Sequence, residues 1–301
     1  MDQQLLVFVT VAEKENFSRA AEQLHMTQPA VSQHIQTLER EFGTRLLERN
    51  NKYVRLNKAG EIVYHHAKEI LRLHTRMHDL VDDLMNTPSG NLIIGSSYTF
   101  GEYVLPHVFA RLRDRYPKIK PTIMIHNTKE IMDLIARRQL DAGIVEGEYQ
   151  HEKLSIEPFA DDEMHIIVSS DHRLAKKEKV TVRELEEETW IVREQGSGTR
   201  EATEKMFARL ELSPTNMMEF GSTQIIKESV EAGMGVSLLS SWAIRKEIRL
   251  GMLCIVKLPE TPITRKFSLV TQANPFRTKA LDIFLDMLRN NEVLPSLVGR
   301  V

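Results

Sequence analysis

Residues 17–39 constrain this chain more than any other stretch, because they read as two short helices joined by a tight turn. The second expected helix carries small polar side chains at its tip, from Thr27 to Gln33. A helix with such a tip fits the major groove of DNA, where base edges offer hydrogen-bond donors and acceptors. The chain is therefore expected to begin with a helix-turn-helix domain.

Apolar residues at helical spacing predict a small three-helix core around this turn. They are Leu5, Phe8, Ala12, Ala20, Ala21, Leu24, Val31, Ile35, Leu38 and Phe42. Ser18 is expected to cap the second helix and Thr27 the third, while Gly43 ends the third. Asn50-Asn51 lies between two short alternating runs and predicts a hairpin, or wing.

The distribution of charge supports a DNA-facing role for this part. The formal net charge of the 301-residue chain is -2, which excludes a uniformly basic nucleic-acid coat but not a local basic surface. The segment 40–58 has a local net charge of +4, from Arg40, Arg45, Arg49, Lys52, Arg55 and Lys58 against Glu41 and Glu48. A solvated charged face is the alternative to a phosphate-contacting surface.

A long helix is expected from about Lys58 to Asn86, ending before Thr87-Pro88-Ser89-Gly90. Its seam positions alternate steps of three and four, which is typical of a coiled coil, and all but His66 are apolar: Val63, His66, Ile70, Leu73, Met77, Leu80 and Leu84. The small N-terminal bundle cannot cover such a stripe, so dimerisation is expected. His74 and His78 stand one turn apart, but no third ligand is near them and no metal site is predicted.

From Gly90 onward, buried strands alternate with helices, which predicts an α/β domain with mostly parallel sheets. About 210 residues suffice for two lobes with a cleft between them. Two turns, Gly95–Gly101 and Gln195–Arg200, are candidate ligand-binding turns. Each follows an expected strand and begins a helix with hydroxyl and glycine residues. Such turns present hydroxyls and backbone N–H groups to an anion. Neither turn matches a nucleotide-binding signature.

The other walls of the cleft are expected to come from the ends of further strands, where ligands bind in doubly wound sheets. The candidate effector-binding residues are Ser96, Ser97, Thr99, Thr128, Glu146, Gly196, Ser197, Gly198, Thr199 and Thr223. Asn127 flanks the second strand, and Arg200 supplies either ligand charge or structure. Each residue alone is also explained as a cap or turn residue.

Other classes of protein find little support. The single cysteine, Cys254, excludes an intramolecular disulfide; its apolar neighbours predict a buried residue, with a redox sensor as the alternative. No signal peptide or run of about 18 apolar residues is visible, so a cytoplasmic protein is expected, without a membrane partner. No nucleophile–base spacing, paired catalytic carboxylates or metal cluster indicates an enzyme or a cofactor.

The chain resembles the LysR-type transcriptional regulators of bacteria. The likeness lies in Phe8, Phe17-Ser18, Ala20-Ala21, Leu24, Gln28-Pro29-Ala30-Val31-Ser32, Ile35, Leu38-Glu39, Gly43, Leu46, Arg49, Leu56 and Ala59-Gly60. Leu47 and Asn57 stand where the family often has Phe and Thr, away from the helix tip. The chain is most similar to the subgroup that governs sulfur assimilation and carbon fixation.

The resemblance implies a multi-domain protein: a winged helix-turn-helix over 1–57, a linker helix over 58–87, a hinge at 88–90 and an effector domain over 91–301. That domain would be α/β and similar to periplasmic binding proteins, with one lobe near 91–161 and 267–301 and the other near 162–266. The DNA-binding residues would be Ser18, Thr27, Gln28, Pro29, Ala30, Ser32, Gln33, Gln36, Arg49 and Arg55.

The partners implied by the resemblance are double-stranded operator DNA, read as an interrupted inverted repeat, and a small metabolite of anionic or other character. A homodimer or a homotetramer is expected, and the resemblance also allows contact with RNA polymerase. Two other classes remain open. A ligand-binding protein without gene control would lack sequence-selective, salt-dependent DNA binding. An enzyme would use the same cleft for catalysis.

Overall fold

The structure, a computed structural model, describes residues 2–49, 53–85, 88–147, 149–273 and 276–290. The chain divides into two compact units, Met1–Met85 and Asn86–Val301, and each is described by itself. Within the described residues, no helix combines the length and apolarity that crossing a membrane requires.

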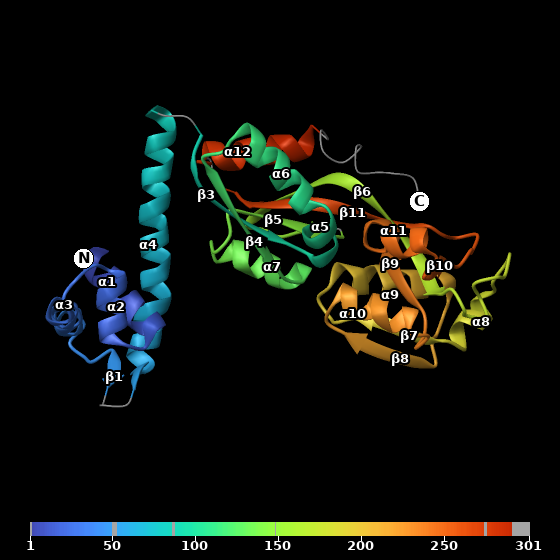
Figure 1. The fold of residues 1–301 in the computed structure, drawn as a ribbon, viewed down its shortest axis with the longest axis horizontal. Helices are drawn as coiled ribbons and strands as arrows, with labels where there is room; N and C mark the ends of the chain where they lie inside the picture. The colour runs from blue at the N-terminus through green and yellow to red at the C-terminus, as the bar shows by residue number, and fades with distance from the viewer. Residues whose placement is uncertain (1, 50–52, 86–87, 148, 274–275, 291–301) are drawn as a thin grey trace. The chain divides into compact units, whose positions relative to one another are not determined.

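The first unit contains the predicted helix-turn-helix (Figure 1). Its elements are α1 (Asp2–Lys14), α2 (Phe17–Gln23), α3 (Gln28–Glu41), β1 (Leu47–Arg49), β2 (Val54–Leu56) and α4 (Lys58–Met85). β1 and β2 pair antiparallel, which confirms the hairpin, although its expected tip at Asn50-Asn51 lies outside the described residues. Val31, Ile35 and Leu38 of α3 are buried with Phe8 of α1, as helical spacing predicted.

The cap expected for α2 is wrong. The N-cap is Asn16, whose side chain accepts a hydrogen bond from the Arg19 N–H at 3.0 Å, and Ser18 is already inside the helix. Asn16 has extended backbone geometry and a short side chain that reaches the N3 amide, so it serves as a cap as well as serine does. Thr27 caps α3 as predicted, and Gly43 follows that helix with a φ of +66°.

The wing is tied to α3 and α4 by close backbone contacts. The Glu39 carboxylate accepts hydrogen bonds from the N–H groups of Leu46 (2.8 Å) and Leu47 (3.3 Å). Gly60 passes so near Leu46 that a Cβ on it would lie 2.0 Å from the Leu46 carbonyl oxygen. A larger residue at position 60 would push α4 away from the wing.

α4 has two different halves. Its first half packs on α1: Ala67 is buried, and the Tyr64 hydroxyl donates to Glu13 at 3.1 Å. From Ile70 onward, α4 exposes apolar side chains from the predicted seam, with exposed fractions of 44% for Ile70, 45% for Leu73 and 53% for Met77. Val63, also predicted in the seam, instead joins the core of the first unit, and the Leu84 side chain lies outside the described part.

The second unit is an α/β structure with a seven-stranded mixed sheet and a separate two-stranded sheet formed by β7 and β8. Its strands are β3 (Gly90–Ser96), β4 (Ile119–Ile125), β5 (Ala142–Glu146), β6 (Leu154–Ser169), β7 (Thr189–Arg193), β8 (Asn216–Phe220), β9 (Ser237–Ser240), β10 (Leu253–Ile255) and β11 (Ile263–Gln272). The helices are α5 (Tyr98–Tyr103), α6 (Leu105–Arg115), α7 (Thr128–Ala136), α8 (Val182–Glu186), α9 (Gly198–Leu210), α10 (Thr223–Glu231), α11 (Ser241–Leu250) and α12 (Lys279–Arg289). The sheet order is β10-β6-β11-β5-β3-β4, with β9 also paired to β6.

The first lobe of this unit is a sheet covered on both faces. α6 and α12 lie on one face and α7 on the other (Figure 1). Neighbouring residues of β5 point to opposite cores, because Ile144 packs with α6 and α12 while Val145 packs with α7. Burial on both faces explains why the strands of this lobe read as continuous apolar runs.

The second lobe has its own pair of cores. Trp190 and Val192 of β7 pack with α9, while Ile191 packs with α10 and α11. Cys254 is half-buried against the core that contains Trp190. Between the lobes run β6 and β11, since Ile263 belongs to the core of the second lobe and Phe267 to that of the first.

The expectation of mostly parallel sheets is wrong for these crossing strands. β3 pairs parallel with β4 and β5, and β7 with β8, but β6 is antiparallel to β9, β10 and β11. The reason is topological. β6 leaves the first lobe and β11 returns to it, so the two neighbours must run in opposite directions.

Candidate functional site

α3 presents a polar face to solvent on the side opposite its buried stripe. Gln28, Pro29, Gln33 and Gln36 are exposed, and Ala30 and Ser32 are half-buried. The Gln28 side-chain amide donates to the Ser32 hydroxyl at 3.0 Å, which holds the two side chains together at the start of the helix. Both keep further donors and acceptors open to solvent. The face offers the polar groups that base edges require.

The other DNA-binding candidates lie on other elements of the first unit or at the start of α3. Thr27 is exposed at the N-cap, and Ser18 is exposed at the second residue of α2. Arg55 is exposed on β2, with its guanidinium carbon 5.3 Å from the centre of the Tyr53 ring. Arg49 ends β1, and its side chain lies outside the described part.

A buried cluster lies where the two lobes of the second unit meet, and Glu146 is its centre. Glu146 ends β5, and its side chain is about 2% exposed. One carboxylate oxygen accepts the Thr99 N–H at 2.9 Å, and the other accepts the Thr199 hydroxyl at 3.3 Å. The first donor opens α5 in one lobe and the second opens α9 in the other, so the carboxylate joins the lobes.

Arg265 of β11 completes the cluster, and the sequence had not indicated it. Its Nη1 lies 2.8 Å from Glu146, its Nε donates to Asp162 at 2.8 Å, and the guanidinium also donates to the hydroxyls of Thr99 (3.1 Å) and Thr199 (3.0 Å). The available signal was alternation: Ile263, Arg265 and Phe267 share the buried face of one strand. A charged residue on such a face requires a charged partner.

Burial and charge shift the pKa values of Glu146 and Asp162 in opposite directions. Burial raises the pKa of Glu146, but the charge of Arg265 and the hydrogen bonds from Ser97 and Thr99 outweigh it, so this pKa is lowered. Burial dominates at Asp162 and raises its pKa to about 6, although Arg265 and the Ser240 hydroxyl act against the rise. Glu146 is therefore the stable anion of the cluster, and Asp162 is the group that titrates near neutrality.

Most of the predicted effector-binding residues lie at or next to the Glu146 cluster, and Thr223 lies in a separate group. Around Glu146 lie Ser97, Thr99, Thr128, Gly198 and Thr199; the Thr128 hydroxyl donates to the Glu146 carbonyl at 3.4 Å, and a Cβ on Gly198 would lie 2.1 Å from that carbonyl oxygen. Ser197 caps α9, and the Gly196 carbonyl accepts the Lys129 N–H at 3.2 Å. Ser96 is buried at the end of β3, with its hydroxyl donating to the Ser97 carbonyl.

Thr223 takes part in a separate buried group centred on Arg193. The Arg193 guanidinium donates to the Thr223 hydroxyl at 3.1 Å and to both oxygens of Glu194 at 2.7 Å. It also lies over the Tyr98 ring, 4.2 Å from its centre. Glu194 in turn accepts a hydrogen bond from Asn127 of the first lobe at 3.4 Å. Sequence reasoning missed Arg193, although it ends an otherwise apolar strand.

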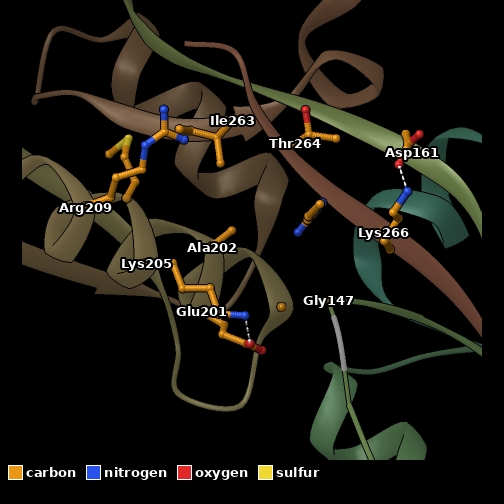
Figure 2. A pocket seen from close by; sticks show the side chains of 12 residues that line it. Gly147, Asp161, Glu201, Ala202, Lys205, Arg209, Ile263, Thr264 and Lys266 are labelled. Atoms are coloured by element: carbon orange, nitrogen blue, oxygen red, sulfur yellow. Dashed lines mark ion pairs between the residues drawn. The ribbon is translucent and has the colours of Figure 1, made fainter. Parts of the chain in front are cut away.

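Two cavities flank this region. The smaller, of about 380 Å³, is lined by Thr128, Gly196 and Ser197 from the predicted turns, with Tyr149, Gln195 and Arg200 among the other walls. The larger, of about 550 Å³, lies between α9 and β11 and shares only Gly198 with the predicted residues (Figure 2). Ser96, Ser97, Thr99, Glu146, Thr199 and Thr223 line neither of these two cavities.

α4 contains two histidine pairs: His74 and His78, considered in the sequence analysis, and His65 and His66, which lie beside Glu69. The rings of His74 and His78 meet edge to face at 4.7 Å. Among the described residues, His65, His66 and Glu69 bring ligand atoms within 4.8 Å of one another on an exposed part of the helix. Glu69 lies 3.2 Å from His66, as in an ordinary surface pair.

Comparison with known proteins agrees with both units. The family described as bacterial regulatory helix-turn-helix protein, lysR family, matches residues 3–61, and the LysR substrate binding domain matches residues 85–292. The HTH-type transcriptional regulator CysL of Bacillus subtilis is 37% identical over 95% of this chain and 96% of its own length. A probable RuBisCO transcriptional regulator of Cyanophora paradoxa is 33% identical over 94% of this chain and 89% of its own.

One solved structure bears on the second unit. The regulatory domain of CcmR from Synechocystis PCC6803, in complex with 2-PG, is 30% identical and matches with a TM-score of 0.62. The match covers 67% of this chain and 97% of that domain. The two family matches and these relatives confirm the predicted resemblance to the LysR-type transcriptional regulators.

Proposed function

Because this chain belongs to the LysR family and is a DNA-binding transcriptional regulator with an effector-binding domain, we propose which of its residues carry the two activities. α3 reads DNA with its exposed polar face. A small anionic molecule binds where the lobes of the second unit meet, and changes how that face is presented. The observation that carries the proposal is the contrast between the open polar face of α3 and the closed polar cluster around Glu146.

Base contacts are assigned to the start of α3. Gln28, Gln33 and Gln36 carry amides that pair with adenine, and Ser32 lies beside Gln28. Pro29 and Ala30 offer apolar surface for a thymine methyl group. Thr27, Ser18, Arg49 and Arg55 are assigned to phosphate contacts, which would set the position of α3 without reading sequence.

The salt dependence of binding tests the phosphate contacts. Full-length protein is titrated into a duplex of random sequence at several salt concentrations. Arg55→Ala is expected to reduce the slope of log affinity against log salt by about 1, because one phosphate contact is lost. Arg183→Ala, on exposed α8, is the matched control and should leave the slope unchanged. An unchanged slope for Arg55→Ala would contradict its assignment.

The exposed stripe of α4, from Ile70 onward, is proposed to pair with a second copy. Ile70, Leu73 and Met77 lie at coiled-coil spacing and stay exposed in the single chain. In a two-fold symmetric dimer, each copy of α3 would read one half-site of an interrupted inverted repeat in the operator. Tetramers would then form by pairing of such dimers. Light scattering of Met77→Glu should show a lower mass than that of Thr75→Glu, a nearby exposed control; equal masses would contradict the seam.

The effector site is assigned to the predicted turns and the smaller cavity beside them. α7 and α9 both begin there, at Thr128 and Gly198, and their first N–H groups favour an anion. The CcmR domain, which resembles this unit, binds 2-PG. A ligand that favours one arrangement of the lobes shifts the protein toward it, by as much as its affinities for the two arrangements differ.

Calorimetric titration with 2-PG tests the site. The double variant Thr128→Ala plus Ser197→Ala, at two residues that line the smaller cavity, is expected to bind at least about tenfold more weakly, because two hydroxyls are removed. Ser213→Ala plus Thr215→Ala, on the loop after α9, is the control and should bind as the wild type does. Equal affinity of both double variants, or no binding by the wild type, would contradict the assignment.

The remaining features of the proposal follow from the family. We take 1–57 as the winged helix-turn-helix, 58–87 as the linker helix, 88–90 as the hinge and 91–301 as the effector domain. Curated relatives are transcriptional regulators, and the present chain is proposed to have no catalytic activity and no cofactor. It would act in the cytoplasm and is open to contact with RNA polymerase.

A further inference from the structure

The larger cavity of the second unit shares Gly198 with the predicted turns but is otherwise lined by different residues. It lies between α9 and the crossing strands, with a volume of about 550 Å³, enough for a small organic molecule (Figure 2). Its floor is buried and largely apolar, formed by Gly147, Gly198, Ala202, Met206, Ile263 and Arg265. Its rim is charged and exposed.

The rim carries more positive than negative charge. Lys205 pairs with Glu201 at 2.7 Å, and Lys266 pairs with Asp161 at 2.5 Å (Figure 2). Arg209, one turn beyond Lys205 on α9, is exposed, and its side chain makes no hydrogen bond or ion pair within the described part of the chain. A small anion would therefore find the guanidinium of Arg209 on a rim that also carries two ammonium groups, each paired with a carboxylate.

We propose that this cavity is a second ligand site, which binds a small organic anion with its charged group at Arg209 and Lys205 and its apolar part on Met206 and Ile263. The site shares Glu201 with the smaller cavity of the proposed effector site, and its other lining residues are different. An apolar floor with a few charged groups at one end is the usual form of such sites.

The second site is connected to the Glu146 cluster through Arg265. Its side chain lines the cavity and also contacts Glu146, Asp162, Thr99 and Thr199. Glu201 offers a second connection, since it accepts a hydrogen bond from Tyr149 of the smaller cavity. An anion that draws Lys205 away from Glu201 would change the charge that faces Tyr149. Binding at the two sites is thus expected to be coupled, and the coupling must be reciprocal.

Phenyl phosphate is a suitable probe, because it joins an anionic group to a flat apolar ring. Calorimetric titration of the full chain is expected to give a dissociation constant on the order of 1 mM. Arg209→Gln should weaken binding by at least about tenfold, since it removes a charged partner of the phosphate. Arg183→Gln removes an exposed arginine elsewhere on the second lobe and should change nothing.

Two further variants locate the probe. Thr264→Phe places a ring into the cavity from its exposed rim and should abolish binding, without disturbing a buried side chain. Ser197→Ala, in the smaller cavity, should bind phenyl phosphate as the wild type does. The proposal is overturned if the wild type does not bind, if Arg209→Gln or Thr264→Phe binds normally, or if Ser197→Ala loses as much affinity as Arg209→Gln.

Discussion

The face of α3 and the cluster around Glu146 both consist mainly of polar residues, uncharged on α3 and largely charged in the cluster, but they differ in exposure. The polar side chains of α3 are exposed or half-buried and all come from the segment 28–36. The cluster is buried and unites Thr99, Glu146, Asp162, Thr199 and Arg265, which lie as far as 166 residues apart in the chain. The polar groups of an exposed face can form hydrogen bonds to a partner molecule. Those of a buried cluster form their hydrogen bonds within the protein. We infer that the face of α3 recognises DNA and that the cluster around Glu146 couples the two lobes of the second unit.

The largest expected effect comes from breaking the buried cluster. Arg265→Ala leaves the carboxylates of Glu146 and Asp162 buried without their shared counter-charge, so the free energy of unfolding should fall by about 3–5 kcal/mol. Urea unfolding followed by circular dichroism measures it. Lys266→Ala, the next residue on the strand, is 42% exposed and should cost less than about 1 kcal/mol. A loss below 1 kcal/mol in Arg265→Ala would contradict a structural role for the cluster.

The cluster should also make stability depend on pH. The pKa of Asp162 is raised to about 6 in the folded chain, so folding favours its protonated form. This contribution to stability is present below pH 4 and is lost as the pH rises to about 6, by on the order of 1–3 kcal/mol. Measuring the free energy of unfolding of the wild type and of Asp162→Asn at pH 4.5, 5.5 and 7 isolates the contribution of Asp162. The variant should gain on the wild type with rising pH; a constant difference would mean that Asp162 does not titrate.

The two regions also differ in how well the sequence predicts them. Residues 17–39 form helices from local spacing and caps, so α2 and α3 were predicted with one wrong cap. The turns at Ser97 and Thr199 were predicted too, because each follows an apolar strand. Arg265 and Asp162 were not, since their partners are set by how β6 and β11 cross. The first half of β6 contains Glu157, Pro158 and Asp161, a composition that reads as a loop, and only pairing with β11 makes it a strand.

The smallest expected effect concerns the cap of α2. Asn16→Ala removes the acceptor of the Arg19 N–H and should lower the free energy of unfolding by about 1 kcal/mol. Ser18→Ala lies inside the helix at an exposed position and should change stability by less than about 0.5 kcal/mol. Chemical denaturation of both variants decides the point. A larger loss in Ser18→Ala would restore Ser18 as the cap.

The central claim is that sequence recognition lies in the exposed face of α3. It is tested most directly by selecting bound duplexes from a random DNA pool with the wild type and with Gln28→Ala in parallel. The wild type is expected to enrich an interrupted inverted repeat, and Gln28→Ala to relax the preference at one position in each half-site, with a loss of about 1–3 kcal/mol on the best wild-type duplex. Enrichment of the same motif at equal affinity by both proteins would contradict base reading by Gln28, and no enrichment by the wild type would contradict the account as a whole.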